Sequence, residues 1–194
     1  MLINMVLPGA AGSAEEPFAF TYSGNFTDNR VDGVGTVRLN TSGTLTVTGS
    51  PVTVTATIVG AGGGAGIGYQ SGASGGGGGN QTVKVELTAG TYEIVIGTGG
   101  VKGSATTTTG TGTGSDGGDT TAFGYTSTGG SGGSASRNSG TGGEGGTPNG
   151  GAGAYGMGSG ANPVNKTGGT PNGGAVVSGT GYDGGDGYVE ITFG

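Results

Sequence analysis

The stretch Val52-Thr-Val-Thr-Ala-Thr-Ile-Val-Gly-Ala-Gly-Gly-Gly64 joins two contrasting kinds of sequence in one short run. Its first half alternates aliphatic residues with threonine, which is the two-residue period of a β-strand with one buried face. Its second half consists almost entirely of glycine, which has no side chain to place in a hydrophobic core. The stretch therefore predicts a β-strand that leads directly into a glycine-rich segment.

The same alternation occurs in other parts of the chain and predicts further strands. Short turns at 40–43 and 88–90 predict that the strands on either side of each turn form a hairpin. No segment has apolar residues at helical spacing, so almost no helix is expected. We predict an all-β fold, an antiparallel β-sandwich of about seven or eight strands. The additional strand segments are 18–22, 36–39, 44–47, 83–87, 92–96, 120–125 and 188–193.

Glycine supplies 55 of the 194 residues and dominates three tracts, at 60–80, 97–118 and 129–187. Such tracts are either flexible linkers or segments with an order of their own. The octapeptide Gly-Gly-Thr-Pro-Asn-Gly-Gly-Ala occurs at 145–152 and again at 168–175, which favours repeated turns between similar straight segments. The straight segments would be polyglycine II helices, extended threefold helices whose backbone groups bond sideways to their neighbours.

The composition excludes several classes of function. A net charge of -6 leaves no basic patch for nucleic acid, and the absence of cysteine removes disulfides and thiolate metal sites. The chain also has no histidine, so the common general bases, catalytic triads and most transition-metal sites are missing. Gly97-Thr-Gly-Gly-Val-Lys-Gly-Ser104 lacks the spacing of a phosphate-binding loop. We therefore expect a protein that is not an enzyme and has no cofactor.

Carboxylates are the remaining candidates for chemistry. The motif Asp-Gly-Gly-Asp occurs twice, with its carboxylates at Asp116 and Asp119 and again at Asp183 and Asp186. Clustered carboxylates bind Ca²⁺, but neither motif fits a known calcium loop. The alternative, which we favour, is that each aspartate caps a turn through its own side chain.

Large side chains are rare within the glycine tracts. Tyr69, Tyr155 and Met157 either cover the sheet or stand at loop tips, where a tyrosine makes amphipathic contacts at low entropic cost. Because Tyr155 and Met157 lie between the two octapeptides, they are our first candidates for receptor contact, with Tyr69 as the third.

Four segments carry a resemblance to a known family: 52–64, Gln81-Thr-Val-Lys-Val-Glu-Leu-Thr-Ala-Gly-Thr-Tyr-Glu-Ile-Val-Ile-Gly-Thr-Gly-Gly100, Asp119-Thr-Thr-Ala-Phe-Gly124, and Gly187-Tyr-Val-Glu-Ile-Thr-Phe193. From about Thr44 onward the chain resembles the glycine-rich domain family. Its members occur in bacteriophage tail and fibre proteins, and a related domain lies in the ectodomain of the anaplastic lymphoma kinase receptor. The resemblance implies a sandwich of the jelly-roll type seen in tumour necrosis factor, with glycine-rich insertions packed as polyglycine II helices.

The chain divides into an N-terminal attachment arm at 1–17 and one glycine-rich domain at 18–194. No stretch approaches the roughly 18 consecutive apolar residues of a spanning helix, and the first residues lack a basic signal-peptide region. We expect synthesis in the cytoplasm of a host cell and function on a virion outside it. Other virion proteins, bound through the arm, and a glycan or protein on a bacterial surface are the expected partners, and tail components are expected to be homo-oligomers.

Three functions remain open from the sequence. The first is a bacteriophage tail-fibre or tail-tip adhesin whose glycine helices hold loops toward a receptor. The second is a purely structural virion component, such as a fibre, plug or decoration protein. The third is a secreted glycine-rich structural or antifreeze-type protein, suggested by the threonine row at 106–113.

Overall fold

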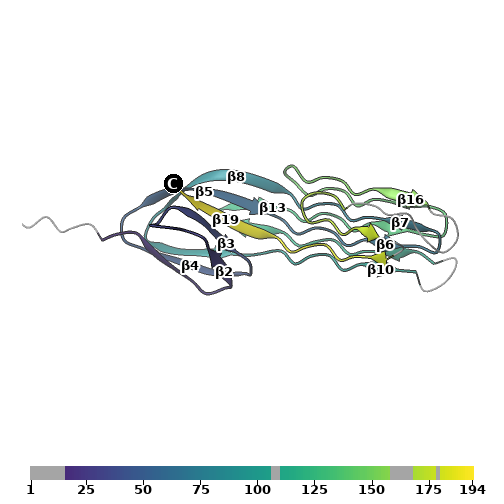
Figure 1. Ribbon diagram of the computed structural model, residues 1–194, viewed down its shortest axis with the longest axis horizontal. Helices are drawn as coiled ribbons and strands as arrows, with labels where there is room; N and C mark the ends of the chain where they lie inside the picture. Colours follow the sequence, from purple (N-terminus) through teal and green to yellow (C-terminus); the bar gives the residue numbers. More distant parts are fainter. Residues whose placement is uncertain (1–15, 106–109, 158–167, 178–179) are drawn as a thin grey trace, which may run out of the picture.

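The chain has two parts, a β-sandwich and a bundle of extended glycine-rich segments, which lie end to end in a computed structural model (Figure 1). The structure describes residues 16–105, 110–157, 168–177 and 180–194. Strands, turns and extended segments make up these ranges, and none of their residues is helical, as the sequence predicted. Residues 1–15 of the predicted N-terminal arm at 1–17 and residues 106–109 of the threonine row lie outside them.

One layer of the sandwich is a five-stranded antiparallel sheet in the order β2-β3-β19-β5-β8. The predicted strand at 52–58 is β5 and lies between β19 and β8, with Ala56 opposite Ile191 on one side and Val83 on the other. As an interior strand of the sheet, β5 has hydrogen-bonding partners along both edges. The strands are β2 (Phe26–Asp28), β3 (Gly35–Leu39), β19 (Tyr188–Phe193), β5 (Val52–Val59) and β8 (Asn80–Leu87).

The second layer is a three-stranded antiparallel sheet in the order β1-β4-β9, and a small hairpin, β12-β13, adjoins it. The two sheets bury their alternating aliphatic residues against each other, so that Leu45 and Ile94 of one sheet share a core with Ile58 and Ile191 of the other. The strands are β1 (Ala19–Tyr22), β4 (Gly43–Thr48), β9 (Gly90–Ile94), β12 (Thr120–Ala122) and β13 (Tyr125–Ser127).

Both predicted hairpins are wrong, although the strands themselves are present. β3 pairs with β2 and β19 while β4 pairs with β1 and β9, so the turn at 40–43 crosses from one sheet to the other. In the same way, β8 pairs with β5 and β9 pairs with β4. Each strand carries one apolar face, and crossing between the layers brings two such faces into contact across the core.

The other part of the molecule is a bundle of nearly straight segments, in which paired β-strands occur only as short pieces (Figure 1). β6 pairs parallel with β10, and β7 pairs antiparallel with β6 and β16. The short strands are β6 (Gly66–Ile67), β7 (Ser71–Ala73), β10 (Gly103–Ser104), β11 (Gly112–Thr113), β14 (Ser134–Ala135), β15 (Gly140–Thr141), β16 (Tyr155–Met157), β17 (Val176–Val177) and β18 (Thr180–Gly181).

Backbone hydrogen bonds in the bundle change direction with a period of three residues. In segment 60–65, the N–H groups of Gly60 and Gly63 donate to segment 76–79, those of Ala61 and Gly64 to 115–118, and those of Gly62 and Ala65 to 182–185. The carbonyl groups of the same segment accept from three further segments, at 100–103, 130–133 and 174. A β-strand bonds to two neighbours in one plane, whereas this segment bonds to six around its axis.

The two central segments, 60–66 and 71–79, are buried along their whole length and contain no residue larger than serine. Small residues are required there by space. A Cβ atom added to Gly76 would lie 1.9 Å from the carbonyl oxygen of Glu144, and one added to Gly78 would lie 2.0 Å from that of Gly60. The described glycines with a left-handed φ are all in the sandwich, such as Gly49 at 81°. Glycine in the bundle therefore permits close approach and does not serve a special backbone angle.

The repeated octapeptide forms the same turn twice, as its recurrence predicted. In each copy the asparagine has a positive φ, 61° at Asn149 and 66° at Asn172, which asparagine tolerates better than most residues. In each copy a glycine N–H closes the turn, from Gly150 to the carbonyl of Gly146 and from Gly173 to that of Gly169, both at 2.8 Å. The two turns reverse the chain at the sandwich end of the bundle.

Candidate functional site

The end of the bundle farthest from the sandwich brings together two exposed turns and one short strand. Turn 68–71 joins β6 to β7 and is closed by the N–H of Gly68, which donates to the carbonyl of Ser71 at 3.0 Å. Turn 136–139 is closed by the N–H of Ser136, which donates to the carbonyl of Ser139 at 2.7 Å. We call these two turns, together with β16, the distal tip. Figure 1 shows β6, β7, β10 and β16 at this end, with the C-terminus at the other.

Tyr69 lies in the first turn and Arg137 in the second. The tyrosine side chain is 39% exposed, and the guanidinium carbon of Arg137 lies 5.9 Å from the centre of its ring. This is within the range of a cation–π contact, which is worth about 0.5–1 kcal/mol at an exposed site. The pair therefore presents an aromatic ring and a positive charge side by side to solvent.

A buried serine holds the two turns against each other. The Ser71 side chain is fully buried, and its hydroxyl donates to the carbonyl of Ser136 and also lies 3.3 Å from that of Ser139. The hydroxyl groups of Ser136 and Ser139 are themselves 2.8 Å apart. The backbone of turn 136–139 is thus held against turn 68–71 by buried and short-range hydrogen bonds, which lowers the entropy that the two turns lose when a ligand binds.

The other two candidate residues, Tyr155 and Met157, belong to β16 and lie at the same end of the molecule. β16 pairs with β7 so that Tyr155 is opposite Ala73 and Met157 is opposite Ser71, two residues from Tyr69. The structure therefore brings the backbones of all three predicted residues together. The side chains of Tyr155 and Met157 lie outside what the structure describes.

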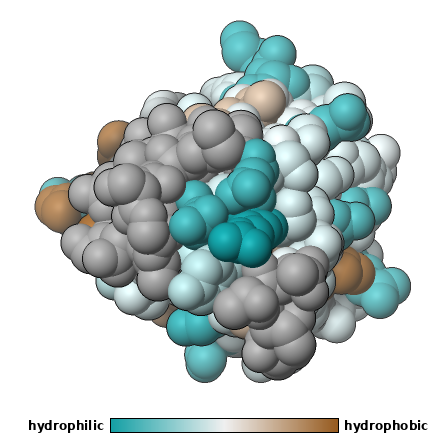
Figure 2. Space-filling view, turned by 90° about the vertical axis from the view of Figure 1, so that its right-hand side faces the viewer, coloured by the Kyte–Doolittle hydropathy of each residue, from teal (hydrophilic) through white to brown (hydrophobic). Residues whose placement is uncertain are grey.

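A shallow cleft of about 290 Å³ lies beside the distal tip. Its walls come from Ile67, next to the Tyr69 turn, from the β10 segment with Lys102, and from β18. Figure 2 shows this end of the molecule from outside, with strongly hydrophilic atoms near the centre of the face and pale surface of intermediate hydropathy to their right. In the described turns, strongly hydrophilic side chains come from Gln70, Arg137 and Asn138.

The two Asp-Gly-Gly-Asp motifs have a structural role that the sequence did not reveal. Asp116 and Asp119 accept the N–H groups of Gly132 and Gly129 at 2.8 and 2.9 Å. In the second motif, Asp183 and Asp186 accept those of Lys102 and Gly99, both at 2.7 Å. Each carboxylate therefore takes the place of a neighbouring backbone carbonyl at the outside of the bundle. The predicted local turn caps are wrong, because the bonded groups belong to other segments.

These bonds also bear on the calcium hypothesis. In each motif, one oxygen of each carboxylate faces a backbone donor, which is the opposite of the surroundings that a cation requires. Among the residues that the structure describes, no group of three or more acidic side chains is arranged to hold a metal ion. We therefore assign both motifs a structural role in joining the outer segments of the bundle.

The spacing of the aspartates is a signal in the sequence that can be recognised once the bundle is known. In the outer segments, every third residue faces solvent and the residues between are mostly glycine. The exposed series are Thr98, Val101 and Ser104, then Thr113, Asp116 and Asp119, then Thr141, Glu144 and Thr147, and then Thr180, Asp183 and Asp186. An exposed residue with a side chain at every third position thus marks an outer segment, whereas 60–66 and 71–79 are buried throughout and contain no residue larger than serine.

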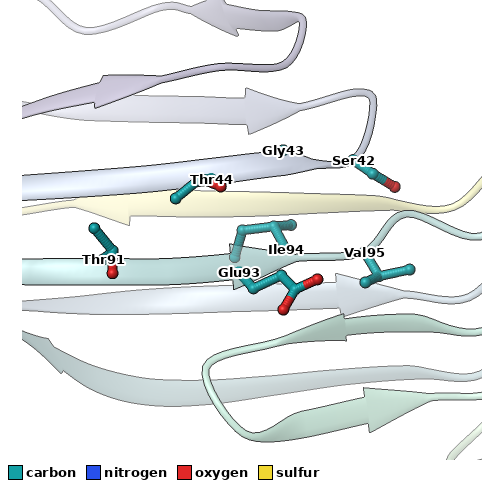
Figure 3. Close-up of a pocket in the computed structure, with 7 residues that line it drawn as sticks. All are labelled: Ser42, Gly43, Thr44, Thr91, Glu93, Ile94 and Val95. Carbon is teal, nitrogen blue, oxygen red and sulfur yellow. The ribbon is translucent and has the colours of Figure 1, made fainter.

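The hollows on the sandwich are lined by few charged side chains. A hollow of about 420 Å³ lies beside β4 and β9, and Glu93 is the one charged side chain among the seven residues that line it (Figure 3). A second, of about 320 Å³, shares Glu93 and adds Glu86, with Tyr92 and Phe123 as its aromatic walls. Both glutamates lie on exposed strand faces.

The pKa shifts that the structure resolves also lie in the sandwich. Burial raises the pKa of Tyr22 to about 12. A side-chain hydrogen bond from Arg30 lowers the pKa of Asp28, and the same bond raises the pKa of Arg30. The two side chains form an ion pair at 2.7 Å, and the guanidinium also stacks on Phe20 and Phe193. These groups stabilise the sandwich far from the distal tip.

The fold and the bundle define an all-β protein in which glycine provides a second packed region. Residues 37–193 match the family model of the glycine-rich domain, so the chain belongs to the glycine-rich domain family. A search of the curated proteins gives no match. The described residues include no helix long and apolar enough to cross a membrane.

Proposed function

We propose that this protein is a display module of a bacteriophage tail fibre or tail tip, which holds its distal tip toward a receptor on the bacterial surface. The proposal rests on where the two ends of the domain lie in the molecule. Both ends of the domain lie at the sandwich, where Phe18 contacts Phe193 with ring centres 5.7 Å apart, while Tyr69 and Arg137 lie at the far end. A module attached through the sandwich would present the tip outward.

The bundle would act as a rigid spacer made of polyglycine II helices. The three-residue period of its hydrogen bonds is the period of an extended threefold helix, and the six neighbours of segment 60–65 fit a hexagonal packing of such helices. Bonds in several directions resist bending of the bundle in any direction, unlike the bonds of a single sheet. A rigid spacer keeps the binding loops ordered before contact, which reduces the entropic cost of binding.

The remaining parts of the proposal rest on the resemblance to tail and fibre proteins. The N-terminal arm would attach the module to other virion proteins, and the module would be a non-enzymatic homo-oligomer of jelly-roll type that functions outside the cell. A position on a virion also suits a chain of few charges and no cysteine, since neither disulfides nor enzymatic groups are needed for display.

Flow cytometry of the fluorescently labelled protein on a panel of bacterial strains tests this function. We expect saturable binding to some strains, with Tyr69→Ala reducing it and Tyr125→Ala leaving it unchanged. Tyr125 is a matched control because its side chain is 40% exposed, against 39% for Tyr69, but lies on β13 near the sandwich. Binding that both variants retain would contradict display by the tip. Absence of binding to every strain would favour the purely structural virion role.

A further inference from the structure

The charges of the molecule are distributed unequally along its length. Although the net charge is -6, the stretches at the distal end, 66–73, 103–105, 133–141 and 175–177, contain no aspartate or glutamate. Their charged residue is Arg137. In the part of the chain that the structure describes, one ion pair is formed, between Asp28 and Arg30 in the sandwich. Within those residues, no carboxylate forms an ion pair with Arg137. An acidic protein thus carries a positive tip.

The tip also combines three kinds of group within one small area. Tyr69 offers a flat apolar ring, Arg137 offers a guanidinium group 5.9 Å from the centre of that ring, and Gln70 and Asn138, which follow them in the two turns, carry amide groups. Sugar rings have apolar C–H faces that stack on aromatic rings, and amides bond their hydroxyl groups in either direction. A guanidinium group forms paired hydrogen bonds with carboxylate or phosphate.

We infer that the distal tip is a binding site for an anionic glycan, a saccharide polymer that carries carboxylate or phosphate groups. This inference rests on the proposed function and names the chemistry of its receptor. The Tyr69 ring would stack on a sugar face while Arg137 pairs with the acidic group of the same or the adjacent unit.

The absence of carboxylates from the described residues of the tip is essential to this inference. A site for neutral sugars commonly uses aspartate or glutamate to accept bonds from hydroxyl groups, and such a side chain would repel an anionic polymer. Ser71 takes part indirectly, as a positioning residue that fixes turn 136–139 and thereby Arg137.

The test is biosensor binding with the full-length protein immobilised through its N-terminus, using three probes: polygalacturonate, a glycerol-phosphate teichoic acid and neutral dextran. We expect binding to at least one anionic probe, weakened by added salt because exposed charges are screened. Preference between the first two probes distinguishes carboxylate from phosphate. Arg137→Gln should lower the affinity at least about tenfold, and Arg137→Lys by less, since charge is kept and the paired geometry is lost. Lys84→Gln, which removes one positive charge from the exposed face of β8, is the matched control.

Other results would overturn the anionic-glycan inference, the proposed function, or both. Equal binding of dextran and the anionic probes, unaffected by Arg137→Gln, would overturn the anionic specificity. Absence of binding to all three probes would also count against it. If labelled protein still binds bacteria through Tyr69 while Arg137→Gln has no effect, the inference fails and the proposed function stands. If neither Tyr69→Ala nor Arg137→Gln alters binding to bacteria, both fail.

Discussion

The sandwich and the bundle bury their chains by different means. In the sandwich, aliphatic side chains such as Leu39 and Ile58 are removed from water, and the free energy comes largely from the hydrophobic effect. In the bundle, the buried segments 60–66 and 71–79 have almost no apolar side chains, and their amide and carbonyl groups bond to several neighbours instead. The comparison shows that a second packed region can form when backbone polar groups find partners and no side chain intervenes.

This difference predicts opposite sensitivities. A hydrophobic core is damaged by the removal of atoms, because a cavity remains. The bundle should be damaged by the addition of atoms, because its segments are in contact backbone to backbone. Glycine also loses more backbone entropy on folding than other residues, so the bundle depends on strands such as β5 and β8 to align its segments.

The largest effect is expected from Gly76→Ala in the centre of the bundle. Its added methyl group would overlap the carbonyl oxygen of Glu144, and the shift would break the bonds from Gly76 to Ser131 and from Gly63 to Gly76. Overpacking and unsatisfied buried groups together should destabilise the bundle by about 5 kcal/mol. Hydrogen exchange, measured by mass spectrometry, should show loss of protection in 60–79.

Gly185→Ala is the matched control for this variant. It lies in an outer segment of the same bundle, and the nearest new contact of an added methyl group would be the Asn172 side chain at 3.3 Å, against 1.9 Å from backbone at Gly76. The control should keep its protection. Equal loss in both variants would contradict the assignment of the effect to close backbone approach at Gly76.

A smaller effect is expected from Ile58→Ala in the sandwich. The side chain is fully buried, and its truncation should destabilise the protein by about 3 kcal/mol through lost transfer free energy and a residual cavity. Chemical denaturation monitored by tyrosine fluorescence measures this change. If Ile58→Val costs as much as Ile58→Ala, the loss would not scale with cavity size and the hydrophobic account of this layer would be wrong.

A third effect concerns the outside of the bundle. Asp119→Ala removes the acceptor of the Gly129 N–H group and should cost about 1 kcal/mol, while Asp119→Asn keeps an oxygen in place and should cost less than about half of that. Thermal unfolding of the two variants provides the comparison. Equal destabilisation would show that the charge matters and that the hydrogen bond does not.

The smallest effect is expected at the surface of the sandwich. The hydrogen bond from Arg30 lowers the pKa of Asp28, so its stabilisation is present above the ordinary pKa of the carboxyl and is lost as pH falls through the lowered value. Asp28 is exposed to solvent, which screens the pair, and Asp28→Asn should cost no more than about 0.5 kcal/mol at neutral pH. Urea unfolding at neutral and strongly acidic pH should show that the wild type and the variant converge in acid. A difference that persists in acid would assign the effect to packing.

Prediction from sequence succeeded for local features and failed for pairing. The alternation at 52–58 and 188–193 identified β5 and β19, and Val189, Ile191 and Phe193 of β19 are buried as such alternation requires. Pairing failed at 40–43 and 88–90, because a short turn is compatible with a hairpin and with a crossing between two sheets. The choice depends on apolar faces that lie far apart in the sequence.

The candidate site was predicted only in part. The rarity of large side chains in the glycine tracts pointed to Tyr69, Tyr155 and Met157, and the structure places their backbones at one end. Arg137 was missed because a single arginine in a polar segment has no pattern that distinguishes it. Its contact with Tyr69 joins residues from two turns that only the bundle brings together.

By itself, the sequence determined the β-strands, the small size of every residue in the central segments, and the two identical turns at 147–150 and 170–173, because alternation, side-chain volume and turn chemistry are local properties. The tertiary structure decided which strands pair, which segments lie at the centre of the bundle, and which backbone amides Asp116, Asp119, Asp183 and Asp186 accept. The physical reason is that the lateral hydrogen bonds between glycine segments join backbone groups, which are the same in every residue, so no side chain specifies which segments pair. Their partners are therefore fixed only when the sandwich aligns the segments side by side.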